Sequence, residues 1–551
     1  MRERTVVDGV TVNAVAGTHV VTLGMDLTAE RRKKCLGFAI QREDRTEDEL
    51  IWLRGLKTFE ETDPGLGPGE SVSSREHPFQ TFQWADYSAK PDHDYVYRVI
   101  PLYGTPEKLT RGPHVDAPIR TEPELAKPHS IFFNRGAIAS QEYARRFLNI
   151  APDKLEGDQQ DAAYRWLSRG LREALLAFIA RATGPQFALH GALYEFKWPE
   201  VLDALGQADA RGADMHIVYD GIPSEDAKKP NEDAIAAAGI GAICEPYTQG
   251  RLMHNKFLVL SKNGKPQAVW TGSTNISENG LFGQLNVGHI VDDRSTASAY
   301  LDYWQQLSDD SPTKELRVWV GDHSPPVAVP PPEEATATLM SPRSGFGVLE
   351  SYAAMGGTGG RPLFMTFAFG MDERFRRVYE QDDGALRFAL MEKEGNGPAL
   401  KEAKEFIRKL RKRPNVVVAV GKHDPANSLD RWQKERADGI GRNVDWVHTK
   451  FMLVDPLSDD PIVVTGSANF SENSTNVNDE NMLVIRGDAR VADIYLGEFM
   501  RSFSHHSFRE ALTFDNAPRS HLLSNPAAWQ ARHFDPKDDH FQRRTYFAQS
   551  G

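Results

Sequence analysis

The chain has 551 residues, more than one hydrophobic core usually serves, so its length predicts two to four domains. Its 40% hydrophobic and 26% charged residues are typical of an ordinary soluble globular protein. The net charge of −12 excludes a global attraction to nucleic acid or anionic membrane, so any polyanion would need a local patch.

The cysteine count and the hydropathy further restrict the class of protein and its cellular location. Cys35 and Cys244 are the two cysteines, too few for a disulfide framework or a zinc site. The sequence has no run of about eighteen apolar residues, and its start carries positive charge without an apolar segment. We therefore predict a cytoplasmic protein with no transmembrane segment, and export without a cleaved signal stays open.

Residues 1–130 have the pattern of an all-β sandwich domain. Alternating runs at 18–23 and 95–103 are separated by turns rich in Gly, Pro and Asp. The segment 82–99 resembles the penultimate strands of a fibronectin type III-like sandwich, in which a buried tryptophan, here Trp84, packs between the sheets with alternating tyrosines.

Residues 131–323 change to alternating helix and strand. A helix is predicted at 199–211, between strands at 187–194 and 215–220, and this β-α-β crossover implies parallel pairing. A proline-rich linker is predicted at 324–334, and residues 335–505 repeat the α/β pattern, with strands at 363–369, 416–420, 451–454 and 462–465 and a helix at 399–412. Residues 506–551 form a tail to which the sequence assigns no role.

One motif occurs twice in the chain. Residues 254–290 and 448–484 align without a gap and share eleven identities, mostly at polar or glycine positions, whereas a repeated fold alone would mainly preserve apolar spacing. The shared positions that carry chemistry are His254, Lys256, Ser273 and Asn275 in the first copy, and His448, Lys450, Ser467 and Asn469 in the second.

These residue types suit a phosphodiester. On a strand, residues i and i+2 point the same way, so each histidine projects with its lysine. Two histidines can supply a nucleophile and a proton donor for the leaving oxygen. Two lysines and two amides can stabilise charge on the other oxygens, and the turns after Gly272 and Gly466 can offer backbone N–H groups and the Ser273 and Ser467 side chains to phosphate. The sequence thus predicts a phosphodiesterase site without metal or cofactor.

The two copies resemble the signature of the phospholipase D superfamily, which is HxK, four residues, Asp, and then GSxN. The second copy matches fully and includes Asp455, whereas the first has Ser261 in place of the acid. The resemblance implies two pseudo-symmetric α/β lobes that form one catalytic unit, and a covalent phosphohistidine intermediate that water cleaves. Because both motifs lie in one chain, a monomer can hold a complete site, and the oligomeric state stays open.

A second asymmetry concerns the partner of each histidine. Glu480 lies 32 residues after His448, and the aligned residue in the first copy is Asn286. In the superfamily a carboxylate near this place holds the far nitrogen of the histidine. A carboxylate favours the imidazolium, so we expect Glu480 to hold His448 as general acid and His254 to be the nucleophile.

The substrate stays open between a phospholipid headgroup and nucleic acid. Residues 471–485 resemble the small nuclease and cardiolipin-hydrolase branch, but the sequence shows neither a continuous basic stripe nor a tryptophan-rich interfacial loop. The basic cluster at 408–413 is the best candidate for a polyanion contact, although a solvated helix end is favoured. For His190, Tyr194 and Glu195, a core or surface role is favoured over a pocket wall.

A binding or scaffolding protein with a degenerate site is the remaining alternative, since Ser261 and Asn286 replace the usual acids. Hydrolysis and transfer of the phosphatidyl group are not distinguished.

Overall fold

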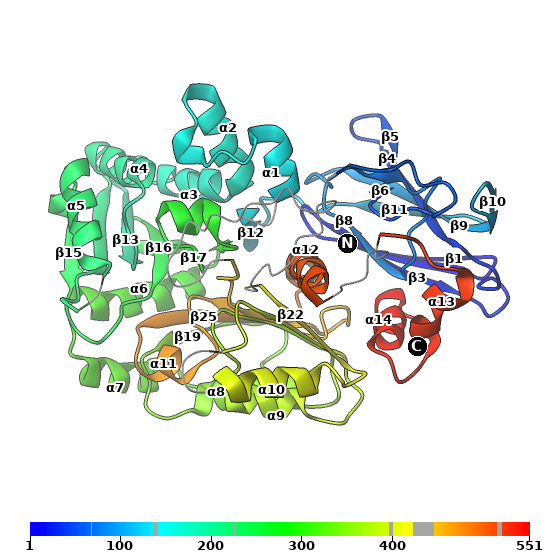
Figure 1. Cartoon of the computed structure of the whole chain (residues 1–551). Helices are drawn as coiled ribbons and strands as arrows, with labels where there is room; N and C mark the ends of the chain where they lie inside the picture. Colours follow the sequence, from blue (N-terminus) through cyan, green and yellow to red (C-terminus); the bar gives the residue numbers. More distant parts are fainter. Residues whose placement is uncertain are drawn as a thin grey trace.

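The computed structural model describes the chain except for residues 68, 137–139, 225, 396–399, 422–445, 515–520 and 551. It consists of two N-terminal antiparallel sheets, two α/β lobes and a C-terminal tail (Figure 1). The predicted fold class, two phospholipase D-like α/β lobes preceded by antiparallel β structure, is confirmed.

The N-terminal domain consists of antiparallel strands, and two of its central strands, at 10–16 and 21–27, are buried along almost their whole length. One sheet has the order β1-β2-β3-β8, with strands at Arg2–Val7, Val10–Ala16, Val21–Leu27 and Gln83–Asp86. The other has the order β10-β9-β4-β5, with β11 also on β9, and its strands are Lys108–Arg111, Asp94–Thr105, Gly37–Asp44, Glu49–Trp52 and Val115–Arg120. A two-stranded sheet joins β6 (Arg54–Gly55) to β7 (Val72–Ser73).

The tryptophan in the core of this domain is not the predicted one. Trp84 is only half-buried, whereas Phe82 is fully buried and stacks on Trp529, with ring centroids 5.2 Å apart. Trp529 comes from the tail and belongs to the same apolar cluster as the strands. The fibronectin type III likeness stays a prediction, because the core tryptophan that it assigned to Trp84 is supplied from the other end of the chain.

The first lobe has a seven-stranded sheet in the order β12-β18-β17-β16-β13-β14-β15. The β13-β14-β15 end is parallel, as the crossover pattern predicts, and the other neighbours are antiparallel. Leu258 and Trp270 face a core with the outer helices, while Phe257 and Val259 face the second lobe. The strands, in sheet order, are His129–Phe133, Val287–Val291, Lys265–Gly272, Lys256–Lys262, Phe187–Leu193, Asp214–Asp220 and Cys244–Tyr247. The helices are α1 (Ser140–Phe147), α2 (Gly157–Ser168), α3 (Leu171–Ala180), α4 (Pro199–Ala210), α5 (Lys228–Ala238), α6 (Arg294–Ser308) and α7 (Thr313–His323).

The second lobe repeats this topology strand for strand, in the order β19-β25-β24-β23-β20-β21-β22 with the same parallel end. Its strands, in sheet order, are Thr336–Ser341, Glu480–Arg486, Ile462–Gly466, Phe451–Val454, Leu363–Phe367, Arg387–Met391 and Val416–Val420. Its helices are α8 (Gly347–Gly357), α9 (Glu373–Tyr379), α10 (Leu400–Leu410), α11 (Glu472–Asn476) and α12 (Ala489–Phe514).

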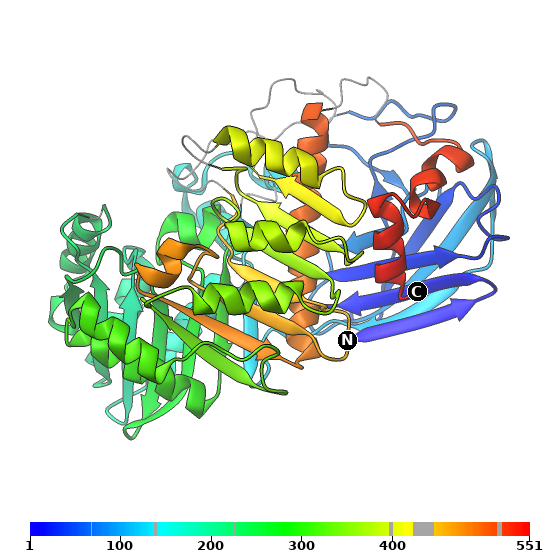
Figure 2. The same ribbon diagram turned by 90° about the horizontal axis from the view of Figure 1, so that it is seen from below.

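Helix α12 lies where the two lobes and the N-terminal domain meet (Figures 1 and 2). It packs on β22, β24, β12 and β2, and it continues across position 505, where the sequence predicted the start of the tail. Its Glu498 pairs with Arg169 of the first lobe at 2.6 Å and with Arg501 at 2.7 Å, and all three side chains are buried. Burial alone would raise the pKa of Glu498, but the two guanidinium groups lower it to about 2.

The tail joins the N-terminal domain to the second lobe. After α13 (Pro526–Ala531), α14 (Asp539–Ala548) lies against β3, and Asn13 Nδ2 donates to Phe547 O at 2.8 Å. A Cβ atom at Gly24 would lie 2.0 Å from the same oxygen, so this close approach requires glycine. The Phe547 ring packs near Phe364 of the second-lobe sheet. In the described part of the chain, no helix is long and apolar enough to cross a membrane.

Replacing Glu498 by Gln should destabilise the protein, because Arg169 and Arg501 would stay buried without a counter-charge. Removing one partner of a buried pair costs about 3–5 kcal/mol, which urea unfolding followed by tryptophan fluorescence would measure at pH 7. The wild-type contribution should be lost as pH falls below about 4.5 toward 2, since the folded-state pKa of Glu498 lies below its ordinary value. Lys229→Ala, which removes the exposed pair with Asp233, is the control and should leave the midpoint unchanged. An unchanged midpoint in the Glu498 variant would contradict the assignment.

Candidate functional site

The two HxK segments meet across the interface between the lobes. His254 and Lys256 enter β16, and His448 and Lys450 lead into β23. The imidazole centroids lie 6.3 Å apart, and both histidines are more than nine-tenths buried. The structure therefore brings together the residues that the duplicated motif singled out, with one half from each lobe.

Backbone pairing between the lobes fixes this geometry. Met253 forms a parallel bridge with Asp479, and Leu285 forms one with Val447. The His254 N–H donates to Asp479 O at 2.9 Å, and the Leu285 N–H donates to Trp446 O at 2.8 Å. Each histidine thus lies beside the first residues of a strand from the opposite lobe.

The histidine partners are consequently exchanged between the lobes. His254 Nδ1 lies 2.9 Å from Glu480 Oε2, and His448 Nδ1 lies 2.8 Å from Asn286 Oδ1. The expectation that Glu480 holds His448 is wrong. Glu480 and His448 belong to the same copy of the repeat, which suggested that they would be partners. The backbone bridges instead place the start of β25, with Glu480, against the segment that carries His254.

Burial shapes the protonation of the site. Desolvation lowers the pKa of Lys256 to about 7, although attraction by Glu480 opposes this shift. Desolvation also lowers the pKa of Lys450 well below its usual range, and repulsion by Lys256 adds to this shift. Desolvation raises the pKa of Glu480 to about 7, and Lys256 opposes it. The pKa values of His254 and His448 fall well below 6.5, because of burial first and the lysines second. A bound anion would restore charge to the lysines.

The GSxN turns hold the histidine partners. Gly272 and Gly466 have no room for a side chain, since a Cβ atom would lie 2.2 Å from a backbone oxygen of the neighbouring strand. Ser273 donates to Asn286 Oδ1 at 2.8 Å and accepts from the Val287 N–H at 3.1 Å. Ser467 accepts from the Asn481 N–H at 3.0 Å. These hydroxyls are engaged within the protein, where they position Asn286 and the start of β25, and the phosphate contact expected of Ser273 and Ser467 stays a prediction.

The two motif asparagines are not fully satisfied by the protein. Asn275 Nδ2 donates to Glu195 Oε2 at 3.1 Å, whereas Asn275 Oδ1 and Asn469 Oδ1 are buried without a hydrogen-bond partner. Unsatisfied buried amide oxygens are rare in folded proteins, and at a candidate site they can accept from a ligand or a reacting water.

Several residues around the site were missed or given a different role from the sequence. The Tyr194 ring lies 5.1 Å from the His254 ring and beneath Lys256 Nζ, and Glu195 also accepts from Ser277 Oγ at 2.6 Å, so both flank the site. Asp220 accepts from the Met253 N–H at 2.9 Å, and Glu392 accepts from the Val447 N–H at 2.8 Å in the second lobe. In each copy an acidic residue lies at the end of a buried strand, and this shared pattern could have identified Asp220 and Glu392 from the sequence.

Three other residues singled out from the sequence lie away from the two motif histidines. Ser261 is at the far end of β16 from His254, at a register shift, and Asp455 occupies the matching place after β23. The missing acid is therefore outside the site. His190 stacks on His216, with centroids 5.5 Å apart, and packs against Trp304.

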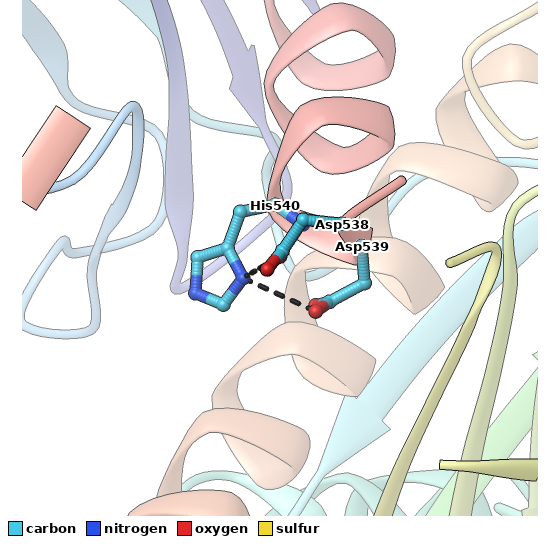
Figure 3. A group of neighbouring side chains, drawn as sticks. All are labelled: Asp538, Asp539 and His540. Carbon is cyan, nitrogen blue, oxygen red and sulfur yellow. Dashed lines mark hydrogen bonds and ion pairs between the residues drawn. The ribbon is translucent and has the colours of Figure 1, made fainter. Parts of the chain in front are cut away.

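Among the described residues, one group of His and carboxylate side chains has the spacing of a metal site, and it lies in the tail. His540 Nδ1 is 2.9 Å from Asp538 and 3.2 Å from Asp539 (Figure 3). Arg532 already contacts both carboxylates, and Asp538 caps α14, so these acids have partners that explain their arrangement.

Comparison with known proteins gives the following. The family model described as the phospholipase D-like domain of cardiolipin synthase matches residues 175–308 and 396–503, one segment in each lobe. No curated protein matches the chain.

Among solved structures, polyphosphate kinase from Porphyromonas gingivalis has 10% identity and a TM-score of 0.36, with 56% of this chain and 42% of that chain covered. The chain thus spans less than half of the kinase. Phosphatidylserine synthase from Haemophilus influenzae has 12% identity and a TM-score of 0.41, with 62% and 85% covered. The phospholipase D family member Nuc from Salmonella typhimurium has 23% identity and a TM-score of 0.22, with 25% and 87% covered.

An oxyanion should bind more tightly as pH falls from 9 to 6, because Lys256 gains its proton near pH 7 in the empty site. Isothermal titration calorimetry with tungstate, in two buffers of different ionisation heat, would measure both the affinity and the proton uptake. Lys256→Ala should weaken binding about tenfold or more. Lys262→Ala, which removes an exposed lysine from the same strand, should not change it. Equal loss in both variants, or binding independent of pH, would contradict this account.

Proposed function

Because the chain belongs to the phospholipase D superfamily through its two matched segments, we propose that it is a metal-independent phosphodiesterase that works through a covalent phosphohistidine. The observation that carries the proposal is the pair of imidazoles facing each other at 6.3 Å, each held at Nδ1 by a residue of the opposite lobe. Nε2 of each ring is then the nitrogen available to a phosphorus atom or a leaving oxygen between them.

The reaction has two displacement steps. His448 is neutral in the empty site, and the bound phosphodiester anion provides the negative charge that favours its protonated form. In the first step, His254 Nε2 forms a bond to phosphorus while the bond to the leaving oxygen breaks, and that oxygen takes the proton from His448 Nε2. In the second, His448 Nε2 accepts a proton from water, the water oxygen bonds to phosphorus, and the bond to His254 breaks. Both histidines then return to their starting states.

The exchanged partners support His254 as nucleophile for a different reason from the one that the sequence suggested. Once Nε2 bonds to phosphorus with Nδ1 still protonated, the His254 ring carries a positive charge, which the Glu480 carboxylate neutralises at 2.9 Å. Asn286 gives His448 a neutral acceptor instead. An imidazolium without a carboxylate partner is the stronger acid, which suits proton donation to the leaving oxygen.

The lysines supply the electrostatic part of catalysis. Lys256 and Lys450 are nearly inaccessible to solvent, and each Nζ donates to the carbonyl oxygen of its own motif histidine. A phosphodiester monoanion between the rings provides the counter-charge that the empty site lacks. Preorganised cations in a desolvated site stabilise charge that develops on phosphate oxygens at little reorganisation cost.

The scaffold alternative depended on Ser261 and Asn286. Ser261 lies away from the rings, and Asn286 Oδ1 still accepts from His448 Nδ1 at hydrogen-bond distance, so neither replacement removes a reacting group. The site residues contact the phosphate, which phospholipids and nucleic acids share, and both substrate classes therefore remain within the proposal.

Activity should survive EDTA and be lost in His448→Asn. Purified protein in EDTA would be tested side by side on phosphatidylcholine and cardiolipin vesicles and on single- and double-stranded DNA and RNA. Headgroup release or strand cleavage that disappears in the variant, by about a thousandfold or more, would support the proposal and choose the substrate. Activity that EDTA abolishes would contradict metal independence.

A chromogenic diester can identify the nucleophile. Because nitrophenolate leaves without a proton, His448→Asn should still form the adduct from a p-nitrophenyl phosphodiester but hydrolyse it slowly, so that mass spectrometry finds the phosphoryl group on His254. Glu480→Gln should slow adduct formation about a hundredfold or more, and the matched variant Asn286→Ala much less. An adduct on His448 would reverse the assigned roles.

A further inference from the structure

A long groove runs between the N-terminal domain and the first lobe. Its walls are the β5–β8 region of the N-terminal domain, helices α1 and α2, the C-terminal half of α12 and the tail (Figure 1). The groove has a volume of about 1830 Å³. Sites for single small molecules usually measure about 300–1,000 Å³, so this volume favours a ligand of several units.

The charge of the groove is opposite to that of the chain. Eight arginine or lysine residues line it, against two carboxylates, although the whole chain has a net charge of −12. Asp86 is buried and bonded to Arg42, which lies outside the lining, whereas Glu142 pairs with Arg146 of the lining itself. Lys90, Arg169, Arg532 and Arg543 also have acidic partners, so the cationic excess is smaller than the count of side chains. Arg54 on one wall and Arg146 on the other are exposed. This distribution complements a polyanion.

Half-buried aromatic rings also line the groove. Trp52 and Trp84 come from the N-terminal domain, and Trp166 comes from α2 on the opposite wall. The Arg135 guanidinium lies 4.9 Å from the Trp166 ring centroid. A cationic groove with aromatic faces is the arrangement by which proteins bind single-stranded nucleic acid, since phosphates contact the cations and bases stack on the rings.

Two short chain segments connect the groove lining to residues around His448. Arg135 follows Asn134, whose Oδ1 accepts from the Asn286 N–H at 2.9 Å, and Asn286 holds His448. On the other side, Phe508 of α12 precedes Arg509, which lies over the Trp446 ring at 5.3 Å, two residues before His448. The groove is thus associated with the side that protonates the leaving oxygen.

We propose that this groove binds single-stranded nucleic acid and makes a nucleic-acid strand the substrate of the proposed site. The inference rests on the proposed function, because it names the substrate class of the same site. An anionic lipid surface fits less well, since the cations lie in a concavity between two domains, whereas interfacial binding uses a protruding apolar face with a basic rim.

The cluster at 408–413 is the natural comparison, because it was the best candidate for a polyanion contact in the sequence, although a solvated helix end was favoured. Within it, Arg411 pairs with Glu510 and Arg413 donates to Gln381 O at 2.8 Å, so part of its charge holds the fold together. Arg408 is exposed on α10 and supplies a matched control for the groove arginines.

Fluorescence anisotropy with a labelled 20-residue oligothymidylate would test the proposal, in EDTA and in the full chain carrying His448→Asn to prevent cleavage. Arg54→Ala combined with Arg146→Ala should weaken binding tenfold or more and reduce the salt slope by about one to two, as loss of two phosphate contacts predicts. Trp166→Ala should weaken binding about five- to a hundredfold, and Trp166→Phe less. Arg408→Ala should have no effect.

Three results would overturn the proposal: unchanged binding in the Arg54/Arg146 double variant, an equal loss in Arg408→Ala, or a groove-dependent affinity for cardiolipin vesicles with no affinity for the oligonucleotide. Thermal melting of each variant would show that it is folded. Because anisotropy measures binding without turnover, groove-dependent binding by a wild-type chain that cleaves nothing would refute the proposed activity and leave the groove assignment standing. Cleavage without groove-dependent binding would do the reverse.

Discussion

The site depends on the exchange of backbone bridges between the two lobes. Because Met253 pairs with Asp479 and Leu285 with Val447, the residue that holds each histidine comes from the other lobe. Further buried hydrogen bonds cross the same interface between the lobes, where Asn481 accepts from Thr271 and donates to Asn255. Neither lobe can orient its own imidazole, so docking of the lobes and assembly of the site are one event. This is a physical reason for both motifs to lie in one chain with a large shared core.

Docking of the two lobes against each other has an electrostatic cost. It buries two lysines, two histidines and Glu480, and it leaves the empty site with pKa values displaced toward the neutral forms of both lysines and the carboxyl group. Such displacement is characteristic of functional sites, where stability is lost in order to hold groups ready for a charged ligand. Under the proposed function, binding of a phosphodiester is therefore coupled to recovery of the lysine protons. The same coupling would make the affinity for anions depend on pH without a conformational change.

The sequence predicted what the duplication encodes directly: two α/β lobes, a parallel end in each sheet, and eight polar residues at equivalent places. It could not predict the partner of each histidine, because an alignment of two copies compares Glu480 with Asn286 inside each copy, and the contact is between copies. Trp529 was missed for a similar reason. It fills the core of a domain more than 400 positions away, and no local pattern marks it as apolar core rather than tail. Glu195 was interpreted as a core or surface residue, because a single acidic residue after a strand forms no repeating sequence pattern.

Net charge is a weak guide to the substrate. A value of −12 argued against nucleic acid, yet charge is an average over the whole surface, and binding depends on the potential inside one concavity. Residues from the β5–β8 region, α1, α2, α12 and the tail converge on the groove, so its cations are scattered in sequence and form no basic run. A catalytic centre that contacts only the phosphate cannot by itself choose between lipid and nucleic acid. The choice then depends on surfaces beyond the motif residues, and the proposed groove, which the N-terminal domain, the tail and helices of both lobes form, is placed to make it.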